Sequence, residues 1–289
     1  IFIPQGEFVA FGALTLAILQ TGRVPGTVWL LLIMAAAVTV LDLVAAWRER
    51  WPAARLARRL LTTLLGPLLA AGAAVALAAH QPPLLVQVLL TLAVVTAMGP
   101  LLYRLAYRAL SGASVLTLLI VSVGVHFALT GIGLVFFGAE GYRTPAFWDA
   151  RFDLGPLSLT GQTLIIFGAS VVLLVGMFLF FERTLTGKAL RATSVNRTGA
   201  RLMGISGDAA GSQTFTMAAF IGALSGLLIS PSTTIYYDTG FLIGLKGFVA
   251  AVFGGLASFP MALSGAVGVG LIESFGSFWA SAFKEVIVF

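Results

Sequence analysis

The sequence predicts an all-α membrane protein, a polytopic bundle of transmembrane helices. Its composition and the spacing of its apolar segments indicate this fold class. Of the 289 residues, 59% are hydrophobic and only 10% are charged, and the mean hydropathy is +1.02. Soluble globular domains carry about 25% charged residues, so this chain lacks the polar side chains that would cover a surface exposed to water. The composition therefore excludes a soluble enzyme, a nucleic-acid-binding domain and a disordered chain.

Apolar runs follow one another along the whole chain. A membrane-spanning helix needs about 20 mainly apolar residues. The runs that approach or reach this length are Phe8–Leu19, Val28–Trp47, Leu60–Ala79, Leu84–Leu102, Val115–Phe137, Leu164–Phe181, Phe215–Ile229, Gly240–Leu256 and Met261–Ala282. We therefore expect about eight to nine membrane segments, some of them short or re-entrant.

Three of these runs are short or rich in Gly and Ser. They are Phe8–Leu19, Phe215–Ile229 and Gly240–Leu256. Interrupted segments of this kind line substrate paths in transporters, but small residues also let ordinary helices pack closely. Gly222 and Gly226, four residues apart, predict such a close contact, either with a partner subunit or within this chain. The sequence decides neither between a substrate path and ordinary helix packing, nor between a partner contact and a contact within this chain.

Basic residues are concentrated in three loops between the runs. Five Arg lie in 48–59, two in 104–108 and five Lys or Arg in 183–201, which together make 12 of the 17 basic residues. Because successive helices alternate in direction, these loops fall on one side, and the positive-inside rule places that side in the cytoplasm. The net charge of +6 is thus explained by topology, with no need for nucleic acid as a partner.

The chain lacks the residues that catalysis or ATP binding would need. The stretch 182–189 matches a phosphate-binding loop only at Gly187-Lys188, so we expect no ATP site here. The two histidines, His80 and His126, are far apart in the sequence, and Cys is absent. We expect no enzymatic activity, no metal and no cofactor on this chain. His126, in the middle of an apolar run, is expected to hydrogen-bond between helices.

The longest polar interval, 182–212, predicts a cytoplasmic loop that contains an amphipathic helix. Apolar residues recur in it at spacings of three, four and three, which is one narrow stripe of a helix. They are Ala192, Val195, Gly199 and Leu202, with Arg191, Ser194, Arg197 and Arg201 on the other side. Such a helix either lies on the membrane surface or docks into a groove of a cytoplasmic partner.

Several segments together carry a family resemblance. They are Gln5–Glu7, Tyr103–Arg108, Arg191–Ile205, Gly244–Gly255, Ser258–Pro260, Gly270–Glu273 and Lys284–Val286. In these segments the chain resembles LivH-type branched-chain amino acid permeases, which are the membrane subunits of ABC importers. The resemblance covers roughly residues 1–20 and 103–289, and it is most specific in its later half.

The resemblance implies a multi-pass transmembrane permease subunit of an ABC importer, located in a bacterial inner or plasma membrane. The substrates would be branched-chain amino acids or related small polar solutes such as amides or urea. A second homologous permease subunit would complete the pathway within the membrane lipids, two cytoplasmic ATPases would bind the ATP, and an extracytoplasmic binding protein would deliver substrate. The loop helix would then dock onto the ATPases. The expected coupling residues are Arg191, Asn196, Arg197, Ala200, Arg201, Gly204 and Ile205.

We expect residues 1–289 to form a single permease domain with one departure from the family pattern. The family usually has one membrane segment between its Gly-Glu motif and its Arg-x-Ala-Tyr-Arg turn, whereas this chain has three apolar runs there. This difference predicts a two-helix insertion within 48–102. Residue 1 is not Met, and 286–289 resembles the beginning of another helix, so we expect a longer gene product.

Charged residues inside apolar runs cost a few kcal/mol on insertion scales, so each needs a partner. Asp42 is expected to reach Arg48 or the membrane interface. Lys246 and Glu273 lie 14 and 13 residues from Pro260, so in an antiparallel hairpin both would be about 20 Å from the turn. We expect them to pair. The pair could be structural or act as a gate in the substrate path, and the alternative in which each residue has a separate partner stays open.

The candidate translocation path is Glu7, Lys246, Gly254, Gly255 and Glu273. Glu7 either faces the interface between permeases or is buried beside hydrogen-bond donors. The alternative function is a stand-alone secondary transporter of amino acids, a class that typically shows internal repeats and charged sites near the midplane. No clear repeat is visible, and carboxylates are few. A membrane-embedded enzyme would need clustered His, Asp or Glu, which the sequence lacks.

Overall fold

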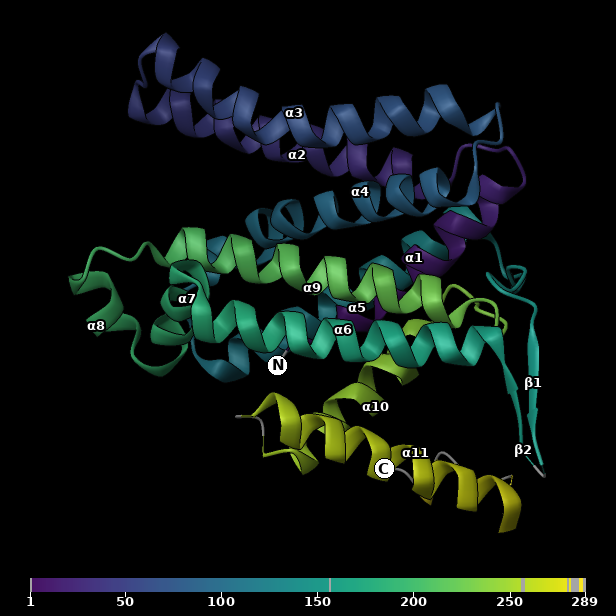
Figure 1. Ribbon diagram of the computed structural model, residues 1–289. Helices are drawn as coiled ribbons and strands as arrows, with labels where there is room; N and C mark the ends of the chain where they lie inside the picture. Colours follow the sequence, from purple (N-terminus) through teal and green to yellow (C-terminus); the bar gives the residue numbers. More distant parts are fainter. Residues whose placement is uncertain (1, 156, 256–257, 280, 282–285, 288–289) are drawn as a thin grey trace.

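The structure is a computed structural model that describes residues 2–155, 157–255, 258–279, 281 and 286–287 (Figure 1). Parts of the resemblance segment Lys284–Val286, and the ends of two expected runs, at Leu256 and at Ala282, lie outside the described residues. The elements in chain order are α1 (Gln5–Gln20), α2 (Gly26–Glu49), α3 (Ala53–Ala78), α4 (Leu84–Leu102), the π-turn η1 (Tyr103–Tyr107), the 3-10 turn η2 (Arg108–Leu110), α5 (Val115–Phe137), β1 (Arg151–Leu154), β2 (Leu157–Thr160), α6 (Gly161–Arg183), α7 (Leu185–Val195), α8 (Arg197–Leu202), α9 (Gly207–Ile229), α10 (Thr239–Phe253) and α11 (Phe259–Trp279).

Seven of the described helices are long and apolar enough to cross a membrane. They are α2, α3, α4 with its continuation to Leu110, α5, α6, α9 and α11. The apolar helices α1 and α10 are shorter, with 16 and 15 residues. All nine expected runs therefore coincide with helices, and the predicted polytopic bundle is confirmed: the chain is a multi-pass membrane protein.

The start of each helix follows from local chemistry. Pro25, Pro52 and Pro83 immediately precede α2, α3 and α4, because proline cannot continue a preceding helix. Five later helices begin with a side chain that accepts a hydrogen bond from the backbone N–H three residues on. These capping residues are Ser114, Thr160, Thr184, Asn196 and Ser206. Such caps satisfy backbone donors that the first helical turn leaves free.

Ser206 also corrects one expectation about helix length. The run Phe215–Ile229 was expected to be short, but α9 has 23 residues and begins at Gly207. The cap at Ser206, whose Oγ accepts from the Ala209 N–H, extends the helix through eight mostly polar or small residues that an apolar-run criterion does not count. The prediction of a short segment at this position is wrong.

The helix α1 lies at the centre of the bundle. Nearly all its residues are buried, and it contacts α9, α4, α10 and α5. Gly222 and Gly226 of α9 face it: a Cβ added at Gly222 would lie 2.7 Å from the Phe8 Cβ, and one at Gly226 would overlap the Val9 carbonyl. The small-residue face of α9 therefore makes a contact within this chain, and its interpretation as a subunit interface is wrong.

The two ends of the bundle differ in charge and structure. The α2–α3 turn, the helices α7 and α8 and the start of α9 lie at one end (Figure 1, left), so the three basic loops share a side as predicted. At the other end lies a two-stranded antiparallel hairpin, β1–β2, in which Arg151 pairs with Thr160. This small sheet within the otherwise helical fold was not expected from the sequence.

The segment 48–102, predicted as a two-helix insertion, forms two helices with different surroundings. α3 lies at the edge of the bundle against α2 and α4, whereas α4 packs against α9, α1 and α2 (Figure 1). Whether these two helices are an insertion depends on a comparison with related chains, so the insertion stays a prediction. The structure adds that α4 belongs to the centre of the fold.

Candidate functional site

The polar loop expected to hold one amphipathic helix contains two short ones, α7 and α8. The chain leaves helical geometry at Asn196, where φ is −145° and ψ is 94°. The Asn196 Oδ1 accepts a hydrogen bond from the Gly199 N–H at 2.9 Å and so starts α8. Asn side chains compete with helical backbone bonds in this way. The continuous stripe from Ala192 to Leu202 was therefore a wrong prediction, because the break separates its two halves.

Polar and packing contacts attach α7 and α8 to the membrane helices. Arg191 Nη1 donates to Glu182 Oε1 at 2.7 Å, which joins α7 to the end of α6. Arg197 donates to the Ser111 carbonyl oxygen, which joins α8 to the turn before α5. Leu190 and Ala200 are buried. The two helices are thus fixed to α6 and to the η2–α5 turn rather than hanging free in solution.

The predicted coupling residues divide into two groups. Arg191, Arg197, Asn196 and Ala200 make the contacts just described, and Gly204 (φ 81°) ends α8 in a left-handed conformation that suits glycine. Their predicted contact with ATPases is untested and stays a prediction. Arg201 is exposed and Ile205 is half-buried.

Four large apolar side chains of this segment are more than 80% exposed. Val195 and Leu202, both in the predicted stripe, are 82% and 84% exposed. Leu185 and Met203, which were not predicted from the sequence, are 87% and 82% exposed. Their exposure could have been predicted from their position, because apolar residues in a basic loop outside the membrane are not buried by the bilayer. They leave an uncovered apolar surface on α7–α8 at the basic end of the bundle.

Glu7 lies inside the bundle rather than at an interface. It is 1% exposed, and a hydrogen bond of 2.7 Å joins its Oε1 to Nδ1 of His126 on α5. The interpretation of Glu7 as buried beside a hydrogen-bond donor is confirmed, and so is the expectation that His126 hydrogen-bonds between helices. The Glu7 side chain therefore does not face an open surface of this chain, and its place in the translocation path stays a prediction.

The other charged pair joins α10 to α11. Lys246 Nζ donates to Glu273 Oε1 at 2.6 Å, and the two side chains are 22% and 31% exposed. The predicted pairing is confirmed, while its role in the path stays a prediction. Gly254 packs against Ala262, and Gly255 (φ 70°) follows the end of α10, so both form the turn of this hairpin.

A cavity of about 530 Å³ opens beside α1, α9 and α10. Its polar lining comes from Gln5, Thr214 and Ser225, and the remainder is mainly apolar, including Phe2 and Phe248. Gln5 Nε2 already donates to the Ala218 carbonyl at 2.9 Å. A mostly apolar surface with a few placed polar groups suits a small solute that has an aliphatic part.

Asp42 does not pair with Arg48. Its Oδ1 contacts the guanidinium of Arg104 and lies 3.8 Å from Nε of Arg59, while Arg48 is exposed. The expectation of a pair with Arg48 is wrong, because packing brings α3 and the end of α4 beside α2 at this depth. No local pattern in the sequence joins these three residues.

Comparison with known proteins identifies the family to which these features belong. A family model described as "Branched-chain amino acid transport system / permease component" matches residues 64–289. The chain belongs to this family. The matched region contains α7, α8, the α10–α11 hairpin and most of the open cavity, whereas Asp42, Arg59 and Glu7 precede it.

Individual relatives carry matching descriptions. BraD of Pseudomonas aeruginosa, a high-affinity branched-chain amino acid transport system permease protein, is 30% identical over 203 residues, or 68% of this chain and 66% of BraD. LivH of Escherichia coli K12 is 27% identical over 203 residues, with the same coverage. A probable LivH of Methanocaldococcus jannaschii is 28% identical over 204 residues, or 67% and 65% of the two chains. The matches span slightly less than two thirds of these relatives. No solved structure matches significantly.

Proposed function

We propose that this chain is the transmembrane permease subunit of an ABC importer for branched-chain amino acids or related small polar solutes. The observation that carries the proposal is the apolar surface of α7–α8, formed by Val195, Leu202, Met203 and Leu185 at the basic end of the bundle. Membership of a branched-chain amino acid permease family supports it, as do the printed descriptions of BraD and LivH.

The contacts that attach α7 and α8 to the bundle would transmit movement from an ATPase to the membrane helices. An ATPase that holds the apolar surface and moves would pull on Glu182 of α6 through Arg191, and on the turn before α5 through Arg197. Both links are charge-assisted, and α7 also packs on α6 through Gly187. Rigid helices that move together in this way rock between two discrete arrangements.

The proposal assigns the remaining tasks to partners. A second homologous permease would close the cavity of α1, α9 and α10, and an extracytoplasmic binding protein would deliver substrate at the β-hairpin end. ATP would bind to two cytoplasmic ATPases, so this chain needs neither a cofactor nor catalytic residues of its own. The lipid bilayer surrounds the remaining helices, and nucleic acid has no role.

Reconstitution tests the transport function. The chain is placed in proteoliposomes with its second permease and ATPases, and uptake of radiolabelled leucine, an amide and urea is measured with binding protein and ATP. We expect leucine uptake that requires ATP and all subunits. Uptake by this chain without ATPases, driven by a sodium or proton gradient, would instead establish the stand-alone secondary transporter.

Substitutions in α8 test the coupling surface. Leu202→Asp combined with Met203→Asp is expected to reduce ATPase co-purification at least tenfold or so, because buried apolar anchors dominate interface energy. Trp47→Ser is the control, since Trp47 is 83% exposed at the same end but on α2. If the α8 variant retains the ATPases and full transport, α7–α8 do not dock them and lipid contact is the better explanation.

A further inference from the structure

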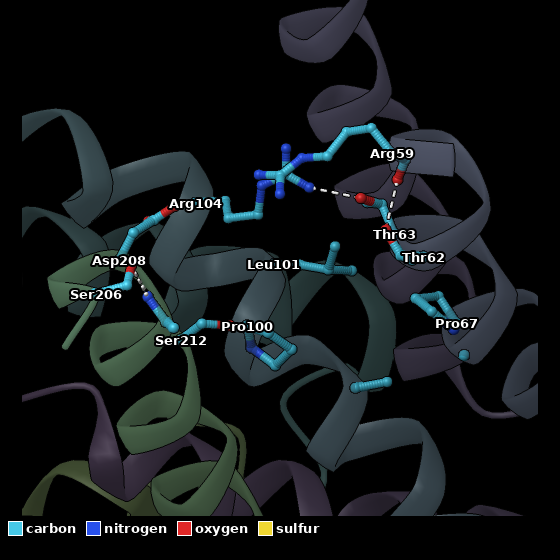
Figure 2. A pocket seen from close by; sticks show the side chains of 13 residues that line it. Arg59, Thr62, Thr63, Pro67, Pro100, Leu101, Arg104, Ser206, Asp208 and Ser212 are labelled. Carbon is cyan, nitrogen blue, oxygen red and sulfur yellow. Dashed lines mark hydrogen bonds between the residues drawn. The ribbon is translucent and has the colours of Figure 1, made fainter. Parts of the chain in front are cut away.

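A second cavity lies at the basic end of the bundle, away from α7 and α8. It has a volume of about 520 Å³ and is enclosed by α3, by α4 with its continuation and by the start of α9. Figure 2 shows Arg59 and Arg104 reaching into it from two sides, so that their guanidinium groups lie beside one another. Thr63 lies next to them and accepts a hydrogen bond of 2.7 Å from Arg104 Nη1.

Positive charge exceeds negative charge at this cavity. Arg59 and Arg104 share a single carboxylate, that of Asp42, which is 4% exposed. The acidic residue of the lining itself, Asp208, pairs with Arg108 at 3.1 Å. Within the part of the chain that the structure describes, Arg59, Arg104 and Arg108 thus face two carboxylates, and one positive charge is left without a matching carboxylate. Charges withdrawn from bulk water are costly unless paired, so the cavity favours an anion.

Arg59 supplies the free hydrogen-bonding capacity. Its side chain is 36% exposed, and its contact with Asp42, at 3.8 Å, is longer than a hydrogen bond. Among the residues that the structure describes, no hydrogen bond uses its guanidinium, and its Nε has no hydrogen-bond partner. A guanidinium has five N–H donors in a planar fork that fits two oxygens of a phosphate.

An apolar groove of about 650 Å³ continues from this cavity toward the middle of the membrane. Gly66, Ala97 and Pro100 line both spaces. On α9 four of the lining residues are spaced by four and so form one helix face. In order from cavity to groove they are Asp208, Ser212, Thr216 and Phe220.

The length of the trough fits one membrane leaflet. Along α3 it runs from Arg59 to Ala73, which is about 21 Å at 1.5 Å per residue. Half of the hydrocarbon core of a bilayer is about 15 Å. An acyl chain in the groove would therefore place its headgroup phosphate beside Arg59.

We propose that this trough binds an anionic phospholipid, with the phosphate on Arg59 and Arg104 and an acyl chain along α3, α4 and α9. Basic pockets between membrane helices on the cytoplasmic side bind acidic lipid headgroups through the same chemistry. A free inorganic phosphate would leave the apolar groove empty. A protein segment would need to present both an acidic group and an apolar stripe to the narrow space between α3 and α9. The site is independent of the transport function proposed above.

Lipid binding to the purified full chain tests the proposal. The chain in detergent is mixed with equal amounts of phosphatidylglycerol and phosphatidylcholine, and bound lipid is counted by native mass spectrometry. We expect a preference for phosphatidylglycerol of about fivefold, as one arginine at a membrane surface provides. Arg59→Gln is expected to abolish this preference, because the remaining Arg104 is then neutralised by its ion pair with Asp42. Arg58→Gln is the matched control, since Arg58 is exposed one position away and does not line the cavity.

A second variant tests the groove without changing any charge. A Cβ added at Gly66 meets nothing within 4 Å, and Gly66 lines both the cavity and the groove, so the side chain of Gly66→Leu is expected to fill their junction. It is expected to lower phosphatidylglycerol binding to the level of Arg59→Gln. Gly72→Leu is its control, because Gly72 has equally open surroundings on the same helix and lies outside the groove.

The outcomes separate the occupants. If inorganic phosphate displaces phosphatidylglycerol and Gly66→Leu has no effect, the site binds phosphate alone and the proposal is wrong. If no lipid is preferred and Gly66→Leu instead weakens association with the second permease, the trough is a subunit interface and the proposal is equally wrong. Loss of preference in Arg59→Gln and Gly66→Leu, with both controls unchanged, supports it.

Discussion

The centre of the bundle and the α10–α11 hairpin each contain a charged pair inside apolar helices, but the two pairs differ in how far they are buried. In the centre, Glu7 is 1% exposed and bonds His126 across two helices. In the hairpin, Lys246 and Glu273 bond each other but keep 22% and 31% of their side-chain surface exposed. This chain alone buries the first pair, whereas the second pair remains accessible at the surface of the chain.

The surrounding helices show the same contrast. Of the apolar stretch in the Leu84–Leu110 helix, 44% is buried, against 17% in Pro260–Trp279. Gly222 and Gly226 bring α9 against α1 in the centre, whereas a Cβ added at Gly247 of α10 meets nothing within 4 Å. The centre therefore has a complete core of its own, and the C-terminal hairpin presents an open face that suits a neighbouring subunit.

The largest expected effect follows from breaking the sealed pair. Glu7→Ala leaves His126 buried without its partner, and loss of one member of a buried pair costs about 3–5 kcal/mol. We expect the free energy of unfolding to fall by that amount, measured by denaturant titration of the chain in detergent micelles. An equal loss in Glu273→Ala would contradict the contrast between the two regions.

Close packing in the centre is expected to be the next most sensitive feature. In Gly226→Val the new side chain overlaps the Val9 carbonyl, and overpacking of this kind costs about 1–3 kcal/mol. Gly247→Val is the matched control on α10, where the space is open. Thermal unfolding of both variants checks the comparison, which fails if Gly247→Val is destabilised as much as Gly226→Val.

The exposed pair is expected to matter less for stability than for function. Single reversals, Lys246→Glu or Glu273→Lys, should lower the free energy of unfolding less than the loss of Glu7 does, because both side chains keep part of their surface exposed. If the pair holds α10 and α11 in a transport-competent arrangement, each reversal lowers ATP-driven uptake and the double reversal restores it. Normal membrane insertion without rescue in the double variant would show that the two residues act separately.

The smallest expected change in stability is at the open face of α10. Gly247→Leu adds a side chain where nothing lies within 4 Å, and Leu also has the higher helix propensity. We expect unfolding of the isolated chain to be unchanged or slightly harder, while association with the second permease decreases in size-exclusion chromatography. Undiminished association would mean that the partner contacts another face.

The sequence predicted the contacts that lie within one hairpin. Lys246 and Glu273 lie 14 and 13 residues from Pro260, so helix rise alone brings them to nearly one depth. The Glu7–His126 bond joins residues 119 apart, and the Asp42–Arg104 contact joins residues 62 apart. No spacing rule relates such residues, because their meeting depends on which helices become neighbours. The expectation for Asp42 failed for that reason.

Composition, apolar runs and charge placement determined by themselves that the chain is a multi-pass membrane protein with its basic loops on one side, because hydropathy and loop charge act locally along the chain. The motif of the polar loop indicated the family. Only the tertiary structure decided that α1 is central, that Asn196 separates α7 from α8, and that Arg59 and Arg104 converge on one carboxylate. These features depend on distances between helices, and packing sets those distances after each helix has formed.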